Sequence, residues 1–354
     1  MPTAEQLKTL VSNVAEPFTG RSLGELGLIR DTFVNGNDAR VRIDLPTPAY
    51  PERKQLEDRI RERIRMAAAE LEPRIELHST VRGKNTGGRV GLNVRNIIAV
   101  GSGKGGVGKS TVAASLACGL HSFGCSVGLM DADVYGPSIP HMMNATGKPA
   151  AEERTDGNGN RVMRMEPIDA GGIKLMSMGF FIDPGQSVVW RGPMLHKALS
   201  QFLSDTDWGE LDYLIIDLPP GTGDVSLTLS QQVGLAGAVV VCTPQQVALL
   251  DAVKAVDMYQ KVNVPILGFV ENMSGEVFGR GGVRRTAEQM KLPYLGEIPL
   301  ESCIREYADN GRMLDLLTEE NAARDGIRQV CQNVAMQVFS ELIRSPSGPT
   351  LEIL

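Results

Sequence analysis

The sequence predicts an α/β fold with a mostly parallel, doubly wound sheet, preceded by a small α+β domain. Three observations predict it. A glycine-rich loop stands between an apolar run and a helix-forming run, further apolar runs end in aspartate, and the N-terminal segment alternates short helices and strands. Strands of a doubly wound sheet present their carboxyl ends to a ligand crevice, so the polar residues after these runs are candidate site residues.

The N-terminal segment is predicted to form a helix over 5–14, strands over 28–34 and 40–45, a helix over 51–71 and a strand over 74–80. Pro51 suits a first helical turn, where no backbone N–H donor is needed. At the other end of the chain, the spacing of Ile327, Val330 and Val334 predicts a closing helix over 321–343 whose apolar stripe faces the core.

A glycine-rich loop follows the apolar run 97–100. Its sequence meets the pattern G-x-x-x-x-G-K-[ST] and reads Gly103-Lys104-Gly105-Gly106-Val107-Gly108-Lys109-Ser110-Thr111. Glycines let successive N–H groups point at phosphate oxygens, and the following helix adds its positive dipole end. We expect Lys109 to reach the outer phosphates and the Ser110 hydroxyl to bind Mg²⁺. The whole run is therefore a predicted ATP-binding loop.

Aspartates end two of the apolar runs. The run 127–130 is followed by Asp131 and Asp133, and the run 213–216 by Asp217. An aspartate after four apolar strand residues is typical of a group that holds magnesium directly or through water. We therefore expect Asp217, with Asp131 in support, to complete the Mg²⁺ site. Pro219-Pro220-Gly221 then makes a stiff turn, suited to a switch loop over 217–224.

Lys104 is a second lysine inside the loop. The pattern K-G-G-x-G-K-[ST] resembles the deviant Walker A loop of dimeric ATPases such as the nitrogenase iron protein and the septum-positioning and plasmid-partition ATPases. The resemblance implies that Lys104 crosses a dimer interface and acts like an arginine finger in the partner's site. It also implies that Asp133 orients the attacking water. The implied catalytic residues are Lys104, Lys109 and Asp133, in a slow ATPase coupled to dimer conformation.

Four further strings narrow the resemblance: D-A-D-V-Y-G-P-S at 131–138, V-W-R-G-P-M at 189–194, L-P-P-G-T-G-D at 218–224 and E-N-M-S at 271–274. From about Arg95 to about Arg312 the chain closely resembles the Mrp/ApbC-type ATPases, known as iron-sulfur cluster carriers. This implies ATP and Mg²⁺ as cofactors, adenine contact by Asn272, a homodimer, and iron-sulfur apo-proteins or assembly factors as partners. Segments 26–29 and 45–51 resemble the small iron-sulfur assembly domain often fused ahead of this ATPase.

These features divide the chain into four predicted parts. An iron-sulfur assembly-like α+β domain is expected over 1–81, and a flexible, basic and glycine-rich linker over 82–95. The P-loop ATPase domain follows over 96–344, and a frayed tail over 345–354.

Thiols are missing at both places where the resemblance predicts them. Relatives usually carry C-x-x-C in the loop after E-N-M-S, so that two chains present four thiolates to one iron-sulfur cluster. Here that loop, 274–282, has no cysteine and is shortened. The assembly domain usually has a cysteine where this chain has Tyr50. The ligands of an iron-sulfur cluster therefore stay unidentified.

The chain has five cysteines, and no two share the close spacing that iron-sulfur ligation normally uses. Cys118, Cys125 and Cys242 fall in a predicted helix and at strand ends, where small buried thiols are ordinary core residues. Cys303 is the candidate exposed thiol. One cysteine per chain supplies only two ligands to a dimer, so a cluster held through Cys303 would need outside ligands.

Composition narrows the class of protein and its partners. A chain of 354 residues with 42% hydrophobic content can bury one large α/β core plus a small domain. No apolar run approaches the roughly 18 residues of a membrane span, and the N-terminus lacks signal-peptide regions, so we expect a cytoplasmic protein without a membrane partner. Residues 1–95 carry a net charge of +3 and the remainder −9, which argues against a nucleic-acid partner of the ATPase.

Three interpretations remain open. The first is an ATP-hydrolysing carrier or scaffold for iron-sulfur clusters, which the motifs favour and the missing thiols weaken. The second is a nucleotide-dependent dimer switch or adaptor that no longer binds a cluster. The third is a positioning ATPase, related to the septum-positioning and plasmid-partition proteins, which would need a basic or amphipathic surface that the sequence lacks.

Overall fold

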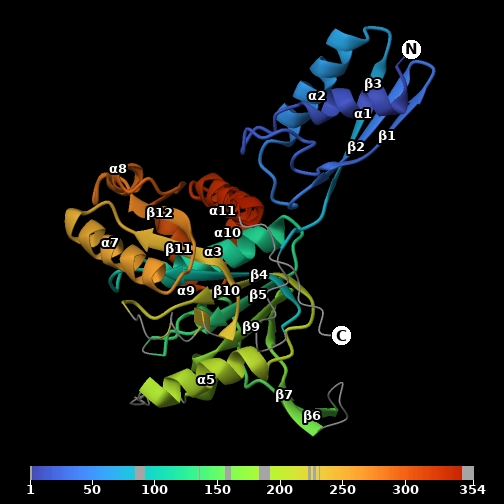
Figure 1. Ribbon diagram of the computed structural model, residues 1–354. Coiled ribbons are helices and arrows are strands. Elements are labelled where there is room, and N and C mark those ends of the chain that lie inside the picture. Colours follow the sequence, from blue (N-terminus) through green and yellow to red (C-terminus); the bar gives the residue numbers. More distant parts are fainter. Residues whose placement is uncertain are drawn as a thin grey trace. The chain divides into compact units, whose positions relative to one another are not determined.

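The computed structural model describes residues 2–83, 92–134, 136–155, 161–182, 192–221, 225, 229–230 and 232–344 (Figure 1). The chain divides into two compact units, residues 1–82 with 342–354, and residues 83–341. Most of the expected linker, all of the expected tail and residues 222–224 of the expected switch loop lie outside the described residues. The bounds expected for the linker, the tail and the switch loop therefore stay predictions.

The N-terminal unit contains α1 (Ala4–Ser12), β1 (Ile29–Asn35), β2 (Asp38–Leu45), α2 (Arg53–Ala67) and β3 (Glu72–Ser79). Its sheet has the order β1-β2-β3, with β1 antiparallel and β3 parallel to β2. Every second residue of β2 is buried and apolar, as a sheet with one covered face requires. The order agrees with the sequence prediction, although α1 begins earlier because Thr3 and Gln6 form a capping box.

The larger unit is built on an eight-stranded sheet of order β13-β12-β11-β4-β10-β5-β9-β8. All neighbouring strands are parallel except the edge pair of β8 and β9. This confirms the predicted mostly parallel sheet. The strands of this sheet are β4 (Val94–Gly101), β5 (Val127–Asp131), β8 (Ile168–Ala170), β9 (Ile173–Ser177), β10 (Leu211–Asp217), β11 (Leu235–Cys242), β12 (Ile266–Ser274) and β13 (Tyr294–Pro299).

Helices lie on both faces of this sheet (Figure 1). A separate hairpin, β6 (Ala151–Thr155) with β7 (Arg161–Met165), forms its own antiparallel sheet. The helices of the unit are α3 (Lys109–Ser122), α4 (Ile139–Met142), η2 (Met178–Phe181), α5 (Gly192–Ser204), α7 (Gln246–Lys261), α8 (Gly282–Gln289), α9 (Ser302–Asp309), α10 (Asp315–Thr318) and α11 (Arg324–Arg344).

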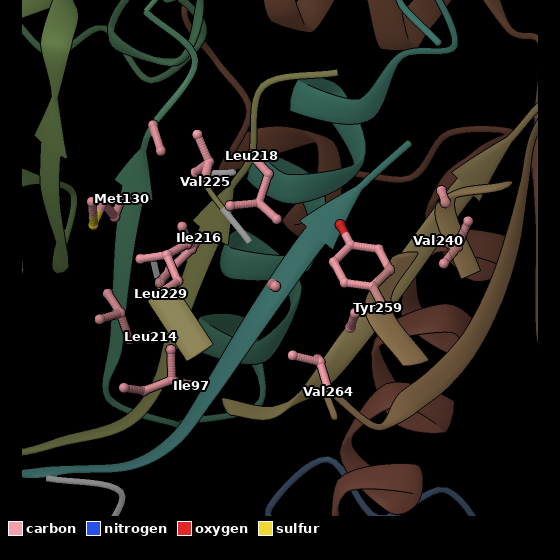
Figure 2. Packing of buried hydrophobic residues seen from close by; sticks show 14 of the residues in the cluster. Ile97, Met130, Leu214, Ile216, Leu218, Val225, Leu229, Val240, Tyr259 and Val264 are labelled. Carbon is pink, nitrogen blue, oxygen red and sulfur yellow. The ribbon is translucent and has the colours of Figure 1, made fainter. Parts of the chain in front are cut away.

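One large hydrophobic core joins the sheet to α5, α7 and α8 (Figure 2). Side chains of β4, β5, β10 and β11, among them Ile97, Met130 and Val240, pack in it with Tyr259 of α7. On the opposite side of the strands α3 packs closely with α11, since a Cβ atom at Gly119 would collide with the Cys331 sulfur. Helices on both faces leave the strand ends as the open edge of the sheet.

The closing helix confirms the sequence prediction with a shifted start. Ile327, Val330 and Val334 of α11 are buried. Asn321 lies before the helix, and its side-chain oxygen accepts hydrogen bonds from the N–H groups of Ala323 and Arg324, at 3.0 and 2.9 Å. It therefore acts as a cap rather than as the first helical residue. No helix in the described part of the chain is both long and apolar enough to cross a lipid bilayer.

Candidate functional site: a phosphate-binding loop at the strand ends

The glycine-rich loop joins β4 to α3 at the carboxyl edge of the sheet. Gly106 and Gly108 have φ angles of 78° and 76°, in the left-handed region that glycine adopts without steric cost. The side-chain nitrogen of Asn272 donates a hydrogen bond of 2.8 Å to the Val107 carbonyl, and a Cβ atom at Gly108 would collide with that nitrogen. The loop conformation is thus fixed by a strand far away in the sequence.

A cavity of about 240 Å³ lies inside the loop. Most of its wall is the loop itself, from Ser102 to Thr111, and the rest comes from two other segments, which contribute Asp133 with Ser138, and Pro220. The cavity therefore brings together the glycine loop, the segment after β5 and the turn after β10, as the sequence predicted for the strand ends.

Lys109 is the buried cation of this cavity, with 6% of its surface exposed. Its ammonium lies 2.6 Å from Asp217 Oδ1, 3.4 Å from Asp133 Oδ2 and 3.3 Å from the Ser110 hydroxyl. Burial raises the pKa of the fully buried Asp217 carboxyl, whereas the Lys109 ammonium lowers it. The lysine is thus paired with the two carboxylates, and phosphate oxygens of a bound nucleotide would have to replace them as its partners.

Asp131 is fully buried, and both of its oxygens are already hydrogen-bonded. The Ser177 hydroxyl donates to Oδ2 at 2.9 Å, and the Asp133 N–H donates to Oδ1 at 3.2 Å. Burial, followed by the negative charge of Asp217, raises the pKa of Asp131 to about 8. Asp131 therefore holds the segment that carries Asp133, and any support that it gives to a metal passes through its neighbours.

The donor set around Asp217 fits Mg²⁺. Asp217 Oδ2 is buried and has no hydrogen-bond partner among the described residues. A carboxylate oxygen without a proton donor is suited to a cation, and the Ser110 hydroxyl beside Lys109 adds a second hard oxygen ligand. Mg²⁺ commonly takes few protein ligands and completes its shell with water and phosphate oxygens. Ser110 and Asp217 therefore match the predicted metal site.

Lys104 is partly exposed and is among the residues that line the cavity of the loop. The Ser102 hydroxyl donates a 2.9 Å hydrogen bond to the Lys104 carbonyl, which fixes the backbone there. Within the described residues its ammonium forms no ion pair. Burial raises the pKa of Cys242, at the end of β11, to about 12, and the positive charge of Lys104 opposes that rise. Gly221, in the turn after β10, donates its N–H to the Ser102 carbonyl at 3.2 Å.

A second cavity, of about 380 Å³, lies beside the first and shares Thr111 and Ser138 with it. Asn272 and Met273 at the end of β12 form one side, and Ile304 and Ala308 of α9 lie among its other lining residues. This largely apolar space next to the phosphate loop has room for a nucleoside. Asn272, predicted to contact adenine, lies in its wall while its amide nitrogen is bound to the loop.

The loop after β12 is short and closed. Gly275 and Gly279 exchange two backbone hydrogen bonds, of 3.0 and 2.8 Å. Glu271, fully buried, accepts the N–H groups of Gly281 and Val283 at 2.7 and 2.8 Å and so caps α8. The exposed residues of the loop are Glu276, Val277, Gly279 and Arg280, with Val277 at 74%. The position at which the resemblance predicts C-x-x-C is therefore a self-paired turn.

Four of the five cysteines are buried, including the three that the sequence placed in the core. Burial raises the pKa of Cys118 well above its usual range and that of Cys331 to about 12, so these thiols stay protonated and are poor metal ligands. Cys303, partly exposed on α9, is the predicted exception. The described residues contain no group of three or more His, Cys, Asp or Glu side chains placed to hold a metal ion.

Tyr50 is buried in the N-terminal unit, where the resemblance predicts a thiol. Its hydroxyl donates to a carboxylate oxygen of the fully buried Glu16. The Glu16 carboxylate also accepts the N–H groups of Phe18 and Thr19, at 3.0 and 2.6 Å. The position thus supplies a structural hydrogen bond and no metal ligand.

Sequence reasoning missed several residues of this region. Ser177 gave no signal, because only the pairing of β9 beside β5 brings it to Asp131. The α9 side chains of the second cavity lie on a helix without buried residues, so no periodic core pattern marked them. Glu271 was visible as part of the E-N-M-S string, but its capping of α8 depends on where the chain turns back.

Comparison with known proteins places these features in a family. Residues 93–335 match the NUBPL iron-transfer P-loop NTPase family, and residues 4–74 match the iron-sulfur cluster assembly protein family. The chain is 45% identical over 344 residues to an iron-sulfur cluster carrier protein of Deinococcus radiodurans, covering 94% of this chain and 95% of that protein. It is 45% identical over 257 residues to the iron-sulfur cluster transfer protein NUBPL of Dictyostelium discoideum, covering 69% and 77%.

Solved structures agree on the fold of the larger unit. A nucleotide-binding protein from Archaeoglobus fulgidus, in complex with ADP, is 37% identical with a TM-score of 0.54, covering 64% of this chain and 90% of that one. The cell division ATPase MinD of Pyrococcus furiosus, 21% identical with a TM-score of 0.50 and covering 68% and 98%, shares the fold. The chain belongs to the NUBPL iron-transfer P-loop NTPase family, with an iron-sulfur cluster assembly domain at its N-terminus.

Proposed function

We propose that this protein is an ATP-dependent iron-sulfur cluster carrier that works as a homodimer. One observation carries the proposal: Lys109 and Asp133 line the cavity inside the glycine loop, and the Lys109 ammonium also contacts the buried Asp217, whose Oδ2 has no hydrogen-bond partner among the described residues. The relatives named as cluster carriers and transfer proteins span most of the same chain. Iron-sulfur apo-proteins are the expected recipients.

ATP binding in this proposal starts with an exchange of partners. Lys109 leaves Asp217 and Asp133 for the outer phosphates, and the loop N–H groups bind the remaining phosphate oxygens. Ser110 and Asp217 would hold Mg²⁺, which neutralises phosphate charge when bound. Asp133, no longer paired with Lys109, then orients the attacking water. Lys104 completes the site of the second copy, where it stabilises the charge that develops on the transferred phosphoryl group.

The cluster is the cargo, and its ligands must come from more than one chain. Thiolates are the usual ligands, and Cys303 is the one thiol of this chain that is not buried. Two copies would supply two sulfur ligands, and the thiols of an apo-protein or an assembly factor would supply the others. A cluster shared in this way is held loosely enough to be passed on.

A second candidate function is a nucleotide-dependent dimer switch or adaptor without a cluster. The closed turn at Gly275–Gly279 and the buried Tyr50 favour it, because both replace expected thiols with groups that are already hydrogen-bonded. In this case ATP would still drive dimerisation, and the partner would be an assembly protein rather than a cluster recipient.

Iron and sulfide analysis after anaerobic reconstitution, with and without ATP, separates the two. A carrier is expected to hold about one four-iron cluster per dimer, visible in the absorption spectrum and lost in Cys303→Ser. Cys125→Ser, in a buried thiol, is the control that should retain it. If no iron is bound under any condition while ATP still drives dimerisation, the protein is a dimer switch and not a cluster carrier. Retention of the cluster in Cys303→Ser would overturn the role of that thiol.

A further inference from the structure

Three neighbouring strands of the large sheet end in polar residues that form one row. Asp217 of β10 pairs with Asp131 of β5, and Asp131 pairs in turn with Ser177 of β9. All three residues are fully buried. The two aspartates are predicted residues of the metal site, and Ser177 is the third member of the row. Its place at the carboxyl edge of the sheet brings it next to the nucleotide site.

The Ser177 hydroxyl takes part in two hydrogen bonds. It donates to Asp131 Oδ2 at 2.9 Å and accepts the Gly179 N–H at 2.9 Å. Because the N–H group can only donate, the hydroxyl proton remains for the carboxylate. The other oxygen of Asp131 accepts the Asp133 N–H at 3.2 Å. A chain of hydrogen bonds therefore runs from the start of η2, through Ser177 and Asp131, to the backbone of Asp133.

The start of η2 also packs against the chain that follows Asp133. A Cβ atom at Gly179 would lie 3.3 Å from Pro137 Cβ and 3.3 Å from Pro140 Cγ, so the η2 backbone lies directly against both prolines. Each proline has a fixed φ angle and is a rigid point of contact. Ser177 thus supports the chain after β5 at two places, at Asp133 through the β5 carboxylate and at the prolines through Gly179.

We propose that Ser177 is a positioning residue for ATP hydrolysis, because it sets the place of Asp133 in the phosphate cavity. The inference rests on the proposed function, in which Asp133 orients the attacking water. Asp133 lines the cavity, and its Oδ2 lies 3.4 Å from the Lys109 ammonium. Ser177 is not among the residues that line this cavity. It therefore acts on the reaction through the backbone that it holds.

This role predicts an effect on turnover rather than on binding. The phosphates are bound by Lys109 and the N–H groups of the glycine loop, which belong to the connection from β4 to α3. Misplacement of a catalytic group by about 1 Å can lower a rate by about 100-fold. Loss of the Ser177 hydroxyl should therefore lower kcat and leave the ATP affinity near its wild-type value.

The first test compares Ser177→Ala with Ser340→Ala in the full chain. The Ser340 hydroxyl is also buried and donates a 2.9 Å hydrogen bond, to the Met336 carbonyl of α11, so the control loses a similar bond away from the sheet edge. Phosphate release measures kcat, and titration with a fluorescent, non-hydrolysable ATP analogue measures affinity. We expect Ser177→Ala to lower kcat at least about tenfold with unchanged affinity. Ser340→Ala should keep the wild-type kcat.

A second comparison determines whether Ser177 acts through Asp133. The substitution Ser177→Ala is made in the wild type and in Asp133→Ala, which already lacks the positioned carboxylate. Effects of residues that act through one another do not add, so Ser177→Ala should lower kcat in the wild type and have no further effect in Asp133→Ala. An equal loss in both backgrounds would show general support of the fold and would overturn the proposal.

Failure of the inference and failure of the proposed function give different results. If Ser177→Ala keeps the wild-type kcat while Asp133→Ala loses it, hydrolysis stands and the positioning role of Ser177 is overturned. If the wild type releases no more phosphate than Lys109→Ala, the proposed hydrolysis and the positioning role both fail. Should Ser177→Ala unfold, Ser177→Cys replaces it, since a thiol is a weaker donor of similar size. A wild-type kcat in Ser177→Cys would equally contradict the proposal.

Discussion

Two loops at the same edge of the sheet differ in how their polar groups are used. The loop after β4 encloses a cavity lined by Lys109, and the Lys109 ammonium lies beside the buried Asp217, whose Oδ2 has no hydrogen-bond partner among the described residues. In the loop after β12, Gly275 and Gly279 are hydrogen-bonded to each other, and Gly281 at the end of the loop donates its N–H to the buried Glu271. Unpaired polar groups around a cavity indicate a ligand, whereas self-paired groups indicate a finished structure. The first loop therefore has the form of a ligand site, whereas the second, at which the resemblance predicts cluster ligands, does not.

Of the substitutions in the two loops, Lys104→Ala is expected to have the largest effect. The partner's site would lose the positive charge that stabilises the transition state, and turnover should fall at least about 10³-fold. ATP affinity should stay near the wild-type value, because Lys109 and the loop backbone remain. Phosphate release measures the turnover, and binding of a fluorescent ATP analogue measures the ATP affinity. Normal turnover would show that Lys104 has no role in catalysis.

Lys109→Ala should act on binding instead. It removes the ammonium that the phosphates need, and it leaves the buried Asp217 without its cation. We expect ATP affinity to fall about 100-fold, the equivalent of about 3 kcal/mol. Calorimetric titration measures this, and Lys197→Ala, in an exposed lysine of α5, is the matched control. Equal affinities for the two variants would remove Lys109 from the site.

A pair of glycine substitutions compares the two loops directly. Gly103→Ala places a methyl group against the Asp251 carbonyl and should weaken ATP binding about tenfold, because the loop must shift. Gly279→Ala meets no atom within 4 Å, but its φ of 86° costs about 1–2 kcal/mol of strain. Its ATP affinity should stay unchanged. Urea unfolding measures the stability of both variants, and ATP titration measures their affinity. An equal loss of ATP affinity in the two variants would contradict the expected difference between the loops.

The smallest effect is expected at Tyr50, the second position at which the resemblance predicts a thiol. Burial, followed by the hydrogen bond to Glu16, raises the pKa of Tyr50 above its ordinary value of 10.0. The folded state therefore keeps a proton that the unfolded state loses above about pH 10, so this stabilisation is present at neutral pH and declines as pH rises. Tyr50→Phe should cost about 1–2 kcal/mol at pH 7. Amide exchange of β2 should show the gap between wild type and variant closing above pH 10; a constant gap would exclude the titration.

Most of the architecture follows from local pattern. Four apolar residues before Asp217 predicted β10, and glycines between a strand and a helix predicted the loop, because burial and phosphate geometry restrict residue types along the chain. The pairing of Lys109 with Asp217, of Ser177 with Asp131 and of Glu271 with α8 could not be read from the sequence. Each depends on which strands become neighbours, and that order is a property of the whole sheet.

The capping of α8 by Glu271 has a practical consequence. The hydrogen bonds to Glu271 and those between Gly275 and Gly279 fix the two ends of the short loop. The residues of its apex, Glu276 to Phe278, take no part in these bonds. The apex is therefore a natural splice point for protein engineering, since residues can be added there without disturbing β12 or the start of α8. A lanthanide tag or a fluorescent peptide inserted at Val277 would follow closely after Asn272 and Met273, two residues that line the second cavity.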